Sequence, residues 1–131
     1  MYFAFAAVPG PPAAPDVCNV LSASCTVKYE LPEDEGDAPV TGYYVQRRSV
    51  MTGADGEWET VNEMPVTSLK LFVDRLQSCS RYQFRVAAEN EKGIGDFGPP
   101  SETVTCLQRR EDECSIPRYG TGQLNLSSCY P

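Results

Sequence analysis

Tyr82-Gln83-Phe84-Arg85-Val86-Ala87-Ala88-Glu89-Asn90 is the stretch of sequence that decides the fold. Every second residue from Tyr82 to Ala88 is apolar, and a period of two over this length predicts a β-strand with one buried face. The strand runs into a turn that carries Gly93, and Leu76 stands six residues before the tyrosine. This arrangement predicts a strand at the corner of a β-sandwich, where the tyrosine hydroxyl hydrogen-bonds to backbone.

Six further strand-like runs occur along the chain, with turn-forming segments between them that are rich in Gly, Pro, Asn and Asp. The runs cover residues 17–21, 25–30, 40–48, 58–61, 69–73 and 101–106, with an acidic loop at 32–39 and a Gly/Pro-rich loop at 90–100. No helical period accompanies them. Seven short strands at fairly regular spacing predict an all-β protein, a seven-stranded antiparallel immunoglobulin-like sandwich.

The inward-facing positions of these strands predict the hydrophobic core. Its largest members are expected to be Tyr29, Tyr43, Trp58, Leu76, Tyr82 and Phe84. The smaller members are expected to be Val20, Cys25, Val27, Val45, Leu71, Val73, Val86 and Val104.

Length and composition restrict the class of protein. The 131 residues suffice for one domain of about 100 residues with tails. The net charge of −7 arises within the first 106 residues, and an acidic surface is a poor match for nucleic acid or anionic lipid. The chain has no His, the commonest general base and metal ligand. No apolar run approaches the roughly 20 residues that cross a bilayer.

The segments outside the strands are assigned by composition. Residues 1–8 are an apolar N-terminal extension, and their lack of a basic start argues against a signal peptide. Residues 9–15 are proline-rich, which predicts a semi-rigid interdomain linker, with a ligand for a proline-binding module as the alternative. Residues 107–131 lack periodic apolar residues and are expected to form a disordered tail.

The ordered strands resemble a fibronectin type III domain over residues 9–106. The resemblance is carried by Pro-Gly-Pro-Pro at 9–12, Cys-Thr-Val-Lys-Tyr at 25–29, the run at 40–48, Trp-Glu-Thr-Val-Asn at 58–62, Leu76, Tyr-Gln-Phe-Arg-Val at 82–86, Asn90, Gly93, Gly95 and Pro-Ser at 100–101. Two features depart from the family pattern. Tyr29 stands where the family usually has Trp, so that its hydroxyl needs a partner if buried, and the acidic loop reads Glu-Gly-Asp at 35–37.

Within the family, the chain is similar to domains of titin, twitchin and the myosin-binding protein C group. The shared style is the Pro-Gly-Pro-Pro segment, Pro-Val-Thr-Gly-Tyr-Tyr-Val before a basic pair, and Trp-Glu-x-Val-Asn with Pro65 behind it. The resemblance implies a non-catalytic structural and protein-binding module within a longer muscle protein of the cytoplasmic sarcomere, with myosin or another filament protein as partner. The alternative is an extracellular cell-adhesion or receptor domain.

Six cysteines at positions 18, 25, 79, 106, 114 and 129 could indicate either metal binding or disulfides. No Cys-x-x-Cys motif occurs, so neither a metal nor another cofactor is expected. Cys25 occupies an inward strand position and Cys79 an exposed turn. Because the family commonly lacks disulfides and cytosol is reducing, free thiols are expected. Bridges and a glycan on Asn125 would instead accompany the extracellular alternative.

Two sets of residues are candidates for partner binding. Arg47 and Arg48 could form a patch with Arg85 for an acidic partner, or could belong to a solvated face balanced by acidic neighbours. Ile94 and Phe97, in the last loop, could contact a partner directly or fold back onto the sandwich. No nucleophile–base pair or phosphate-binding loop emerges, so no enzymatic activity is expected.

Overall fold

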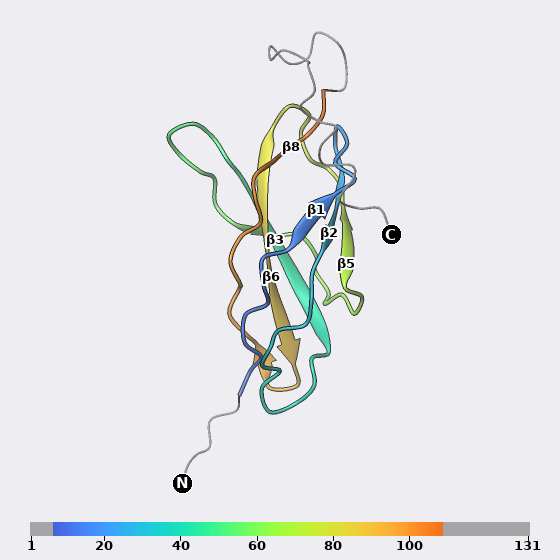
Figure 1. The fold of residues 1–131 in the computed structure, drawn as a ribbon, viewed down its shortest axis with the longest axis vertical. Helices are drawn as coiled ribbons and strands as arrows, with labels where there is room; N and C mark the ends of the chain where they lie inside the picture. The colour runs from blue at the N-terminus through green and yellow to red at the C-terminus, as the bar shows by residue number, and fades with distance from the viewer. Residues whose placement is uncertain (1–6, 109–131) are drawn as a thin grey trace.

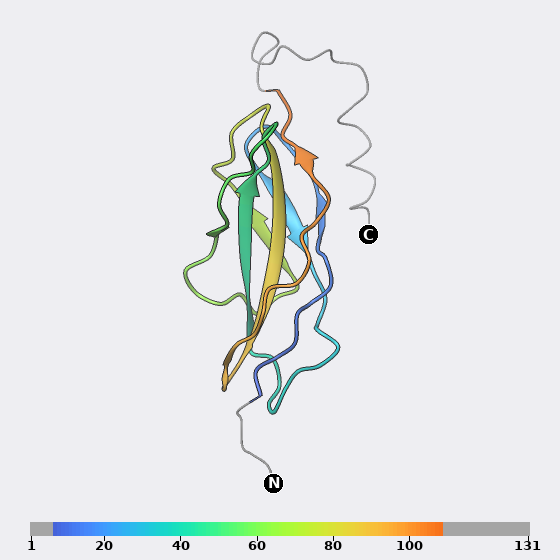
Figure 2. The same ribbon diagram turned by 90° about the vertical axis from the view of Figure 1, so that its left-hand side faces the viewer.

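The computed structural model describes residues 7–108 and shows two antiparallel sheets packed face to face (Figures 1 and 2). The smaller sheet has the strand order β1 (Asp16–Cys18), β2 (Cys25–Lys28), β5 (Lys70–Val73). The larger sheet has the order β4 (Glu59–Thr60), β3 (Gly42–Ser49), β6 (Arg81–Asn90), β7 (Gly93–Ile94), and β8 (Val104–Thr105) pairs with the other end of β6. The predicted all-β antiparallel sandwich is confirmed. Within residues 7–108, no helix has the length and apolar character needed to span a membrane.

The pairing of β3 with β6 forms the centre of the larger sheet. Its register runs from Gly42 opposite Glu89 to Ser49 opposite Tyr82 without interruption. Along β6, the alternation read from the sequence places Tyr82, Phe84 and the residues in step with them inward. The strand predicted from the decisive stretch is therefore confirmed.

The last strand is divided, which the sequence did not predict. β7 and β8 pair with opposite ends of β6, and the chain between them remains attached to it. The amides of Gly95, Gly98 and Ser101 donate to β6 carbonyls at 2.9, 2.9 and 2.7 Å. Pro99 and Pro100 have no amide hydrogen to donate, so the hydrogen bonding to β6 is interrupted between Gly98 and Ser101. The predicted loop at 90–100 therefore follows the edge of the sheet.

The core lies between the two sheets and contains nearly all of the expected residues. Its buried members are Val20, Cys25, Val27, Tyr29, Tyr43, Val45, Val73, Leu76, Tyr82, Phe84, Val86, Ala88, Val104 and Cys106, with Leu71 partly buried against them. The rings of Tyr29 and Tyr43 lie 5.0 Å apart. Trp58 was expected in this core but lies outside it, half-buried near the edge strand β4. Its position next to such a short strand gives no alternation from which its direction could be inferred.

The hydroxyl groups of two buried tyrosines are satisfied by backbone. The Tyr82 hydroxyl oxygen accepts a hydrogen bond from the Gln77 amide at 2.9 Å, which confirms the predicted sandwich corner. The Tyr29 hydroxyl donates to the Ser68 carbonyl at 2.9 Å. Burial, and then the neighbouring Tyr43, raise the pKa of Tyr29 to about 12, so it remains a donor at neutral pH.

The proline-rich segment at 9–15 packs on the domain and is not a free spacer. Pro9, Pro12 and Pro15 are buried, a spacing of three that matches one face of a polyproline II helix. A Cβ atom at Gly95 or Gly98 would collide with the carbonyl groups of Pro9 and Pro12, respectively. The absence of side chains at these glycines lets the two segments lie in contact (Figure 2).

Asn90 joins three segments at the end of the sandwich. The residue is 2% exposed, and its side-chain amide donates to the carbonyls of Ala7, Glu35 and Ala38 at 3.2, 2.9 and 3.3 Å. Its Oδ1 accepts from the Lys92 amide at 2.8 Å. One side chain thus holds the N-terminal segment, the acidic loop and the β6–β7 turn together.

The described cysteines are in two different redox states. Cys25 and Cys106 are free thiols buried in the core. Cys18 and Cys79 are disulfide-bonded, so the expectation of free thiols is wrong for these two. Cys79 is also half-buried and not exposed. The inward-position argument concerned Cys25 alone and does not fix the state of a cysteine at a strand end or in a turn. Cys114, Cys129, the predicted tail and Asn125 lie outside the described residues, as do residues 1–6.

Candidate protein-binding face

The outer face of the larger sheet begins with two matched pairs of side chains. Gln46 stands opposite Arg85, and Arg48 stands opposite Gln83, across the β3–β6 pairing. In each pair the arginine donates to the glutamine Oε1: Arg85 Nε at 2.9 Å, and Arg48 Nε and Nη2 at 3.1 and 2.9 Å. Each guanidinium is therefore fixed by a neutral partner on the neighbouring strand.

These arginines stack with aromatic rings in a row that we call the ladder: Arg48, Trp58, Arg85 and Phe97. The guanidinium carbons of Arg48 and Arg85 lie 4.6 and 4.3 Å from the Trp58 ring centroid. Arg85 is also 4.8 Å from the centroid of Phe97. Burial, and then the nearby charge of Arg48, lower the pKa of Arg85. The ladder explains why Trp58 lies on the outer face, where its π surface binds two cations.

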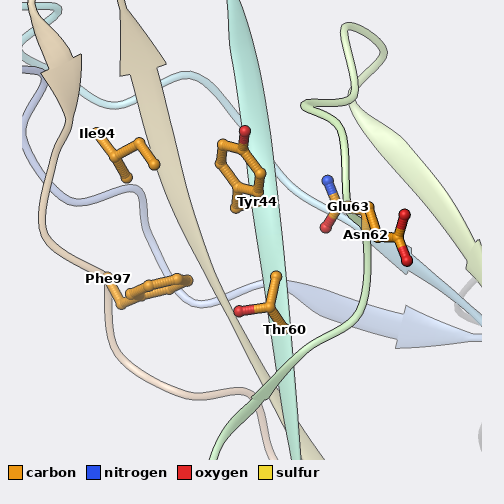
Figure 3. Close-up of a pocket in the computed structure, with 6 residues that line it drawn as sticks. All are labelled: Tyr44, Thr60, Asn62, Glu63, Ile94 and Phe97. Carbon is orange, nitrogen blue, oxygen red and sulfur yellow. The ribbon is translucent and has the colours of Figure 1, made fainter.

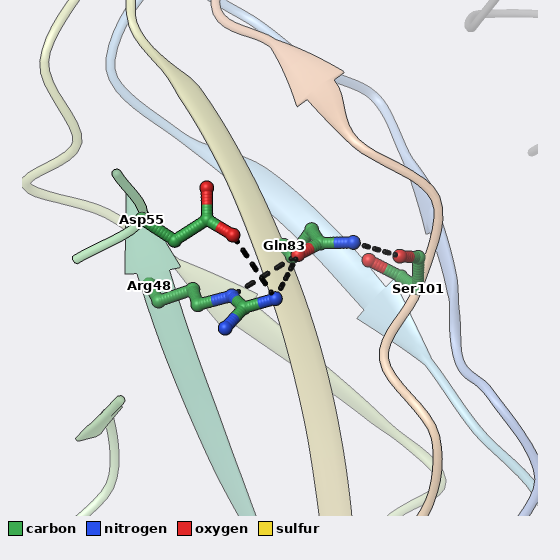
Figure 4. Close-up of polar contacts among 4 residues, drawn as sticks. All are labelled: Arg48, Asp55, Gln83 and Ser101. Atoms are coloured by element: carbon green, nitrogen blue, oxygen red, sulfur yellow. Dashed lines mark hydrogen bonds and ion pairs between the residues drawn. The ribbon is translucent and has the colours of Figure 1, made fainter. Parts of the chain in front are cut away.

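Further polar contacts hold Arg48 and its partner in place (Figure 4). Arg48 Nη2 lies 3.5 Å from an Asp55 carboxylate oxygen, contributed by the loop between β3 and β4. Gln83 in turn donates from Nε2 to the Ser101 carbonyl at 3.1 Å. The network thus joins β3, the β3–β4 loop, β6 and the segment between β7 and β8, and it leaves Arg48 engaged on several sides.

Arg47 does not join Arg48 and Arg85 in one patch. It alternates with Arg48 on β3 and lies on the other side of the strand, stacked over the Tyr82 ring at 5.7 Å. Its guanidinium donates to the Arg75 carbonyl at 3.4 Å and lies 3.6 Å from a Glu59 carboxylate oxygen. The structure therefore brings Arg48 and Arg85 together and separates Arg47 from them.

A groove lies beside the ladder, on the same face of the sheet (Figure 3). It is open to solvent, has a volume of about 450 Å³, and is lined by Tyr44, Thr60, Asn62, Glu63, Ile94 and Phe97. Figure 3 shows Ile94 and Phe97 on one side, Tyr44 in the middle, and Asn62 and Glu63 on the other side. The two candidate residues Ile94 and Phe97 thus meet at one site. Ile94 is 48% exposed, whereas Phe97 is half-buried against Arg85.

Asn62 fixes the wall of the groove opposite Ile94. Its Oδ1 accepts from the Val45 amide at 2.9 Å, and its Nδ2 donates to the carbonyls of Tyr43 and Met64 at 3.0 and 2.7 Å. The side chain replaces backbone pairing where the chain leaves β4, before Val66 bridges to Tyr43. Sequence reasoning missed this role because it treated Asn62 only as part of a motif. Tyr44, Thr60 and Glu63 were missed as well.

The described residues offer no cluster for a metal ion: among residues 7–108, no group of three or more His, Cys, Asp or Glu side chains is suitably placed. The polar groups of this face instead bind one another. The arrangement suits contact with another protein, since it combines the exposed Ile94 and two half-buried aromatic side chains with a polar surround on a hydrogen-bonded sheet.

Comparison with known proteins agrees with this architecture. The family model described as "Fibronectin type III domain" matches residues 10–104. Human myomesin-2 is 35% identical over 99 residues, which cover 76% of this chain and 7% of that protein. Chicken striated-muscle M-protein is 35% identical over 96 residues, or 73% of this chain and 6% of that protein. The chain therefore spans less than a tenth of the length of these two relatives.

A solved titin domain has the same fold. Titin module A71 from human cardiac muscle is 30% identical, with a TM-score of 0.67, and the match covers 76% of this chain and 93% of that one. The relatives are thus muscle proteins, and the likeness includes both sequence and fold. The chain belongs to the fibronectin type III family.

Proposed function

We propose that the chain provides a non-catalytic structural and protein-binding module of a muscle filament protein. In this role it spaces neighbouring domains in a longer chain and binds a filament protein, with myosin as the first candidate. The observation that carries the proposal is the groove, because it places exposed Ile94 and half-buried Phe97 on a continuously paired sheet. The relationship to muscle proteins supplies the biological context.

The spacing role is supported by the way in which the ends of the domain are secured. The proline-rich segment packs against Gly95 and Gly98, and Asn90 binds the carbonyl of Ala7. A module whose N-terminal segment is anchored in this manner fixes the orientation of a neighbouring domain better than a module on a flexible linker. Arg47 and Arg48 do not carry the binding role in this proposal, because both are engaged within the domain.

Co-sedimentation with purified muscle myosin filaments tests the binding role. The double variant Ile94→Ala/Phe97→Ala should lower the bound fraction at least fivefold, because apolar anchors dominate such contacts. The matched control is Leu31→Ala, which removes an exposed apolar side chain that does not line the groove. Urea unfolding of all variants checks that the fold is retained. Normal binding by a folded double variant would exclude the groove as the myosin site.

We propose the cytoplasmic sarcomere as the location of this chain, on the ground of its muscle relatives. Disulfides such as those of Cys18 and Cys79 are rare in cytosolic proteins, so the test of location uses a different modification. Mass spectrometry of protein from its native source should find Asn125 without a glycan if the sarcomere proposal holds. A glycan on Asn125 would favour the extracellular alternative.

A further inference from the structure

We propose that the groove binds a protein segment that carries an apolar side chain next to a basic one. This inference rests on the function proposed above, and it specifies the chemistry of the partner at the same site. It differs in charge from the acidic partner that the arginines offered as one of two possibilities in the sequence.

The apolar requirement comes from the lining of the groove. Tyr44, Ile94 and Phe97 provide its apolar surface, and Ile94 is 48% exposed in the free domain. The volume of about 450 Å³ is enough for one or two side chains of a docked segment. Burial of this surface would supply the favourable contact area.

The charge requirement comes from one acidic side chain that lines the groove and from two at positions next to Ile94. Glu63 lines the groove and is exposed, and no lysine or arginine lines it. Glu89 stands opposite Ile94 in the β6–β7 pairing, and exposed Asp96 lies between Ile94 and Phe97 in sequence. None of these three carboxylates forms an ion pair among the described residues, whose ion pairs involve Glu59 and Asp55.

The nearby cations do not line the groove. Arg48 is paired with Asp55, and Arg85, which forms no ion pair among the described residues, lies between Trp58 and Phe97 and donates to Gln46. An acidic segment in the groove would therefore meet the Glu63 carboxylate directly, whereas a lysine or arginine beside an apolar anchor would pair with it. Charge complementarity of this kind determines the choice of partner more than it determines affinity.

NMR titration of the full chain, labelled with ¹⁵N, tests the inference with three synthetic peptides. The probes are acetyl-Gly-Lys-Leu-Lys-Gly-amide, its charge-reversed form with Glu in place of Lys, and a form with Ser in place of Leu. Millimolar Lys-Leu-Lys peptide should shift the amide signals of Tyr44, Glu63 and Ile94 in a saturable manner, and the other two peptides should not. Equal shifts with the acidic peptide, shifts spread over both sheets, or no shift with any peptide would overturn the proposal.

Matched variants separate the groove from general attraction to an acidic protein. Glu63→Gln should weaken binding of the Lys-Leu-Lys peptide about 2–5-fold, the range for one exposed ion pair, and Glu30→Gln should not. Glu30 is an exposed carboxylate that follows β2 of the other sheet and does not line the groove. Equal weakening by both variants would show unspecific attraction and would refute the site.

Failure of this inference can be distinguished from failure of the proposed function. If the Lys-Leu-Lys peptide does not bind but the Ile94→Ala/Phe97→Ala variant loses myosin, the groove is a docking site with a different chemistry. If the peptide binds as expected but myosin binding is unchanged in the variant, the groove has another partner. In the first case the present inference falls, and in the second the myosin proposal falls.

Discussion

Replacing Tyr82 with Phe removes one oxygen atom from the corner of the sandwich and leaves the buried ring in place. The lost interaction is the 2.9 Å hydrogen bond that the hydroxyl accepts from the Gln77 amide. A neutral hydrogen bond contributes about 0.5–1.5 kcal/mol, and a donor left without a partner adds to the cost. Gln77 is exposed, so water can recover part of the loss. We expect the free energy of unfolding to fall by about 1–2 kcal/mol.

Urea unfolding followed by fluorescence measures this change, and the slope with denaturant should stay constant because the buried surface is retained. The melting temperature should fall by about 4–8 °C for each kcal/mol lost. Tyr44→Phe is the matched control, since the Tyr44 hydroxyl forms no hydrogen bond within residues 7–108 and its removal should change stability by less than about 0.5 kcal/mol. An unchanged midpoint for Tyr82→Phe, or equal effects of both variants, would refute the corner assignment.

Three further predictions concern buried contacts. Asn90→Ala should lower the unfolding free energy by about 2–4 kcal/mol, because three backbone carbonyls lose a buried donor. Gly98→Ala should destabilise by more than about 2 kcal/mol through collision with backbone, whereas Gly53→Ala, which meets no atom but has a φ of 87°, should cost about 1–2 kcal/mol. Burial chiefly raises the pKa of Cys25 to about 12 and that of Cys106 to about 11, from 9.0. The folded state disfavours the thiolate form of both residues. The stability gained by burying the protonated thiols should therefore be complete below pH 9 and decline as the pH rises towards 12.

Each of these predictions has an outcome that contradicts it. A loss below about 0.5 kcal/mol for Asn90→Ala would mean that water replaces its hydrogen bonds. Equal urea midpoints for the two glycine variants would argue against close packing of the proline-rich segment. For the thiols, the control is Cys25→Ala/Cys106→Ala, and an unchanged alkaline decline in that variant would assign the decline to other groups.

The sequence predicted the sandwich because its strands alternate over a sufficient length. Alternation from Tyr82 onward fixed the inward face of β6, and the same pattern identified β2 and β3. It failed for Trp58, which precedes a strand of two residues and so belongs to no measurable pattern. For the proline-rich segment, composition indicated the extended form but could not show that Gly95 and Gly98 contact it.

The candidate site was predicted only in part, because a site formed across strands depends on register. Ile94 and Phe97 were identified from their position in a loop, and the structure places both at the groove. The matched arginine–glutamine pairs could have been found from Gln-x-Arg, which occurs at 46–48 and again at 83–85. Two such motifs on antiparallel neighbours place each arginine opposite a glutamine only when the strands are aligned as observed.

That alignment has a consequence for how the domain avoids misfolding. A slip of β3 against β6 by two residues would keep every apolar side chain facing inward, so burial alone would not detect the error. One such slip would place Arg48 opposite Arg85, and the slip in the other direction would place it opposite Arg81. Directly opposed like charges are destabilising. Arg48 therefore disfavours both of the slipped pairings that would still bury the apolar side chains. It thus favours the observed register of β3 and β6 during folding.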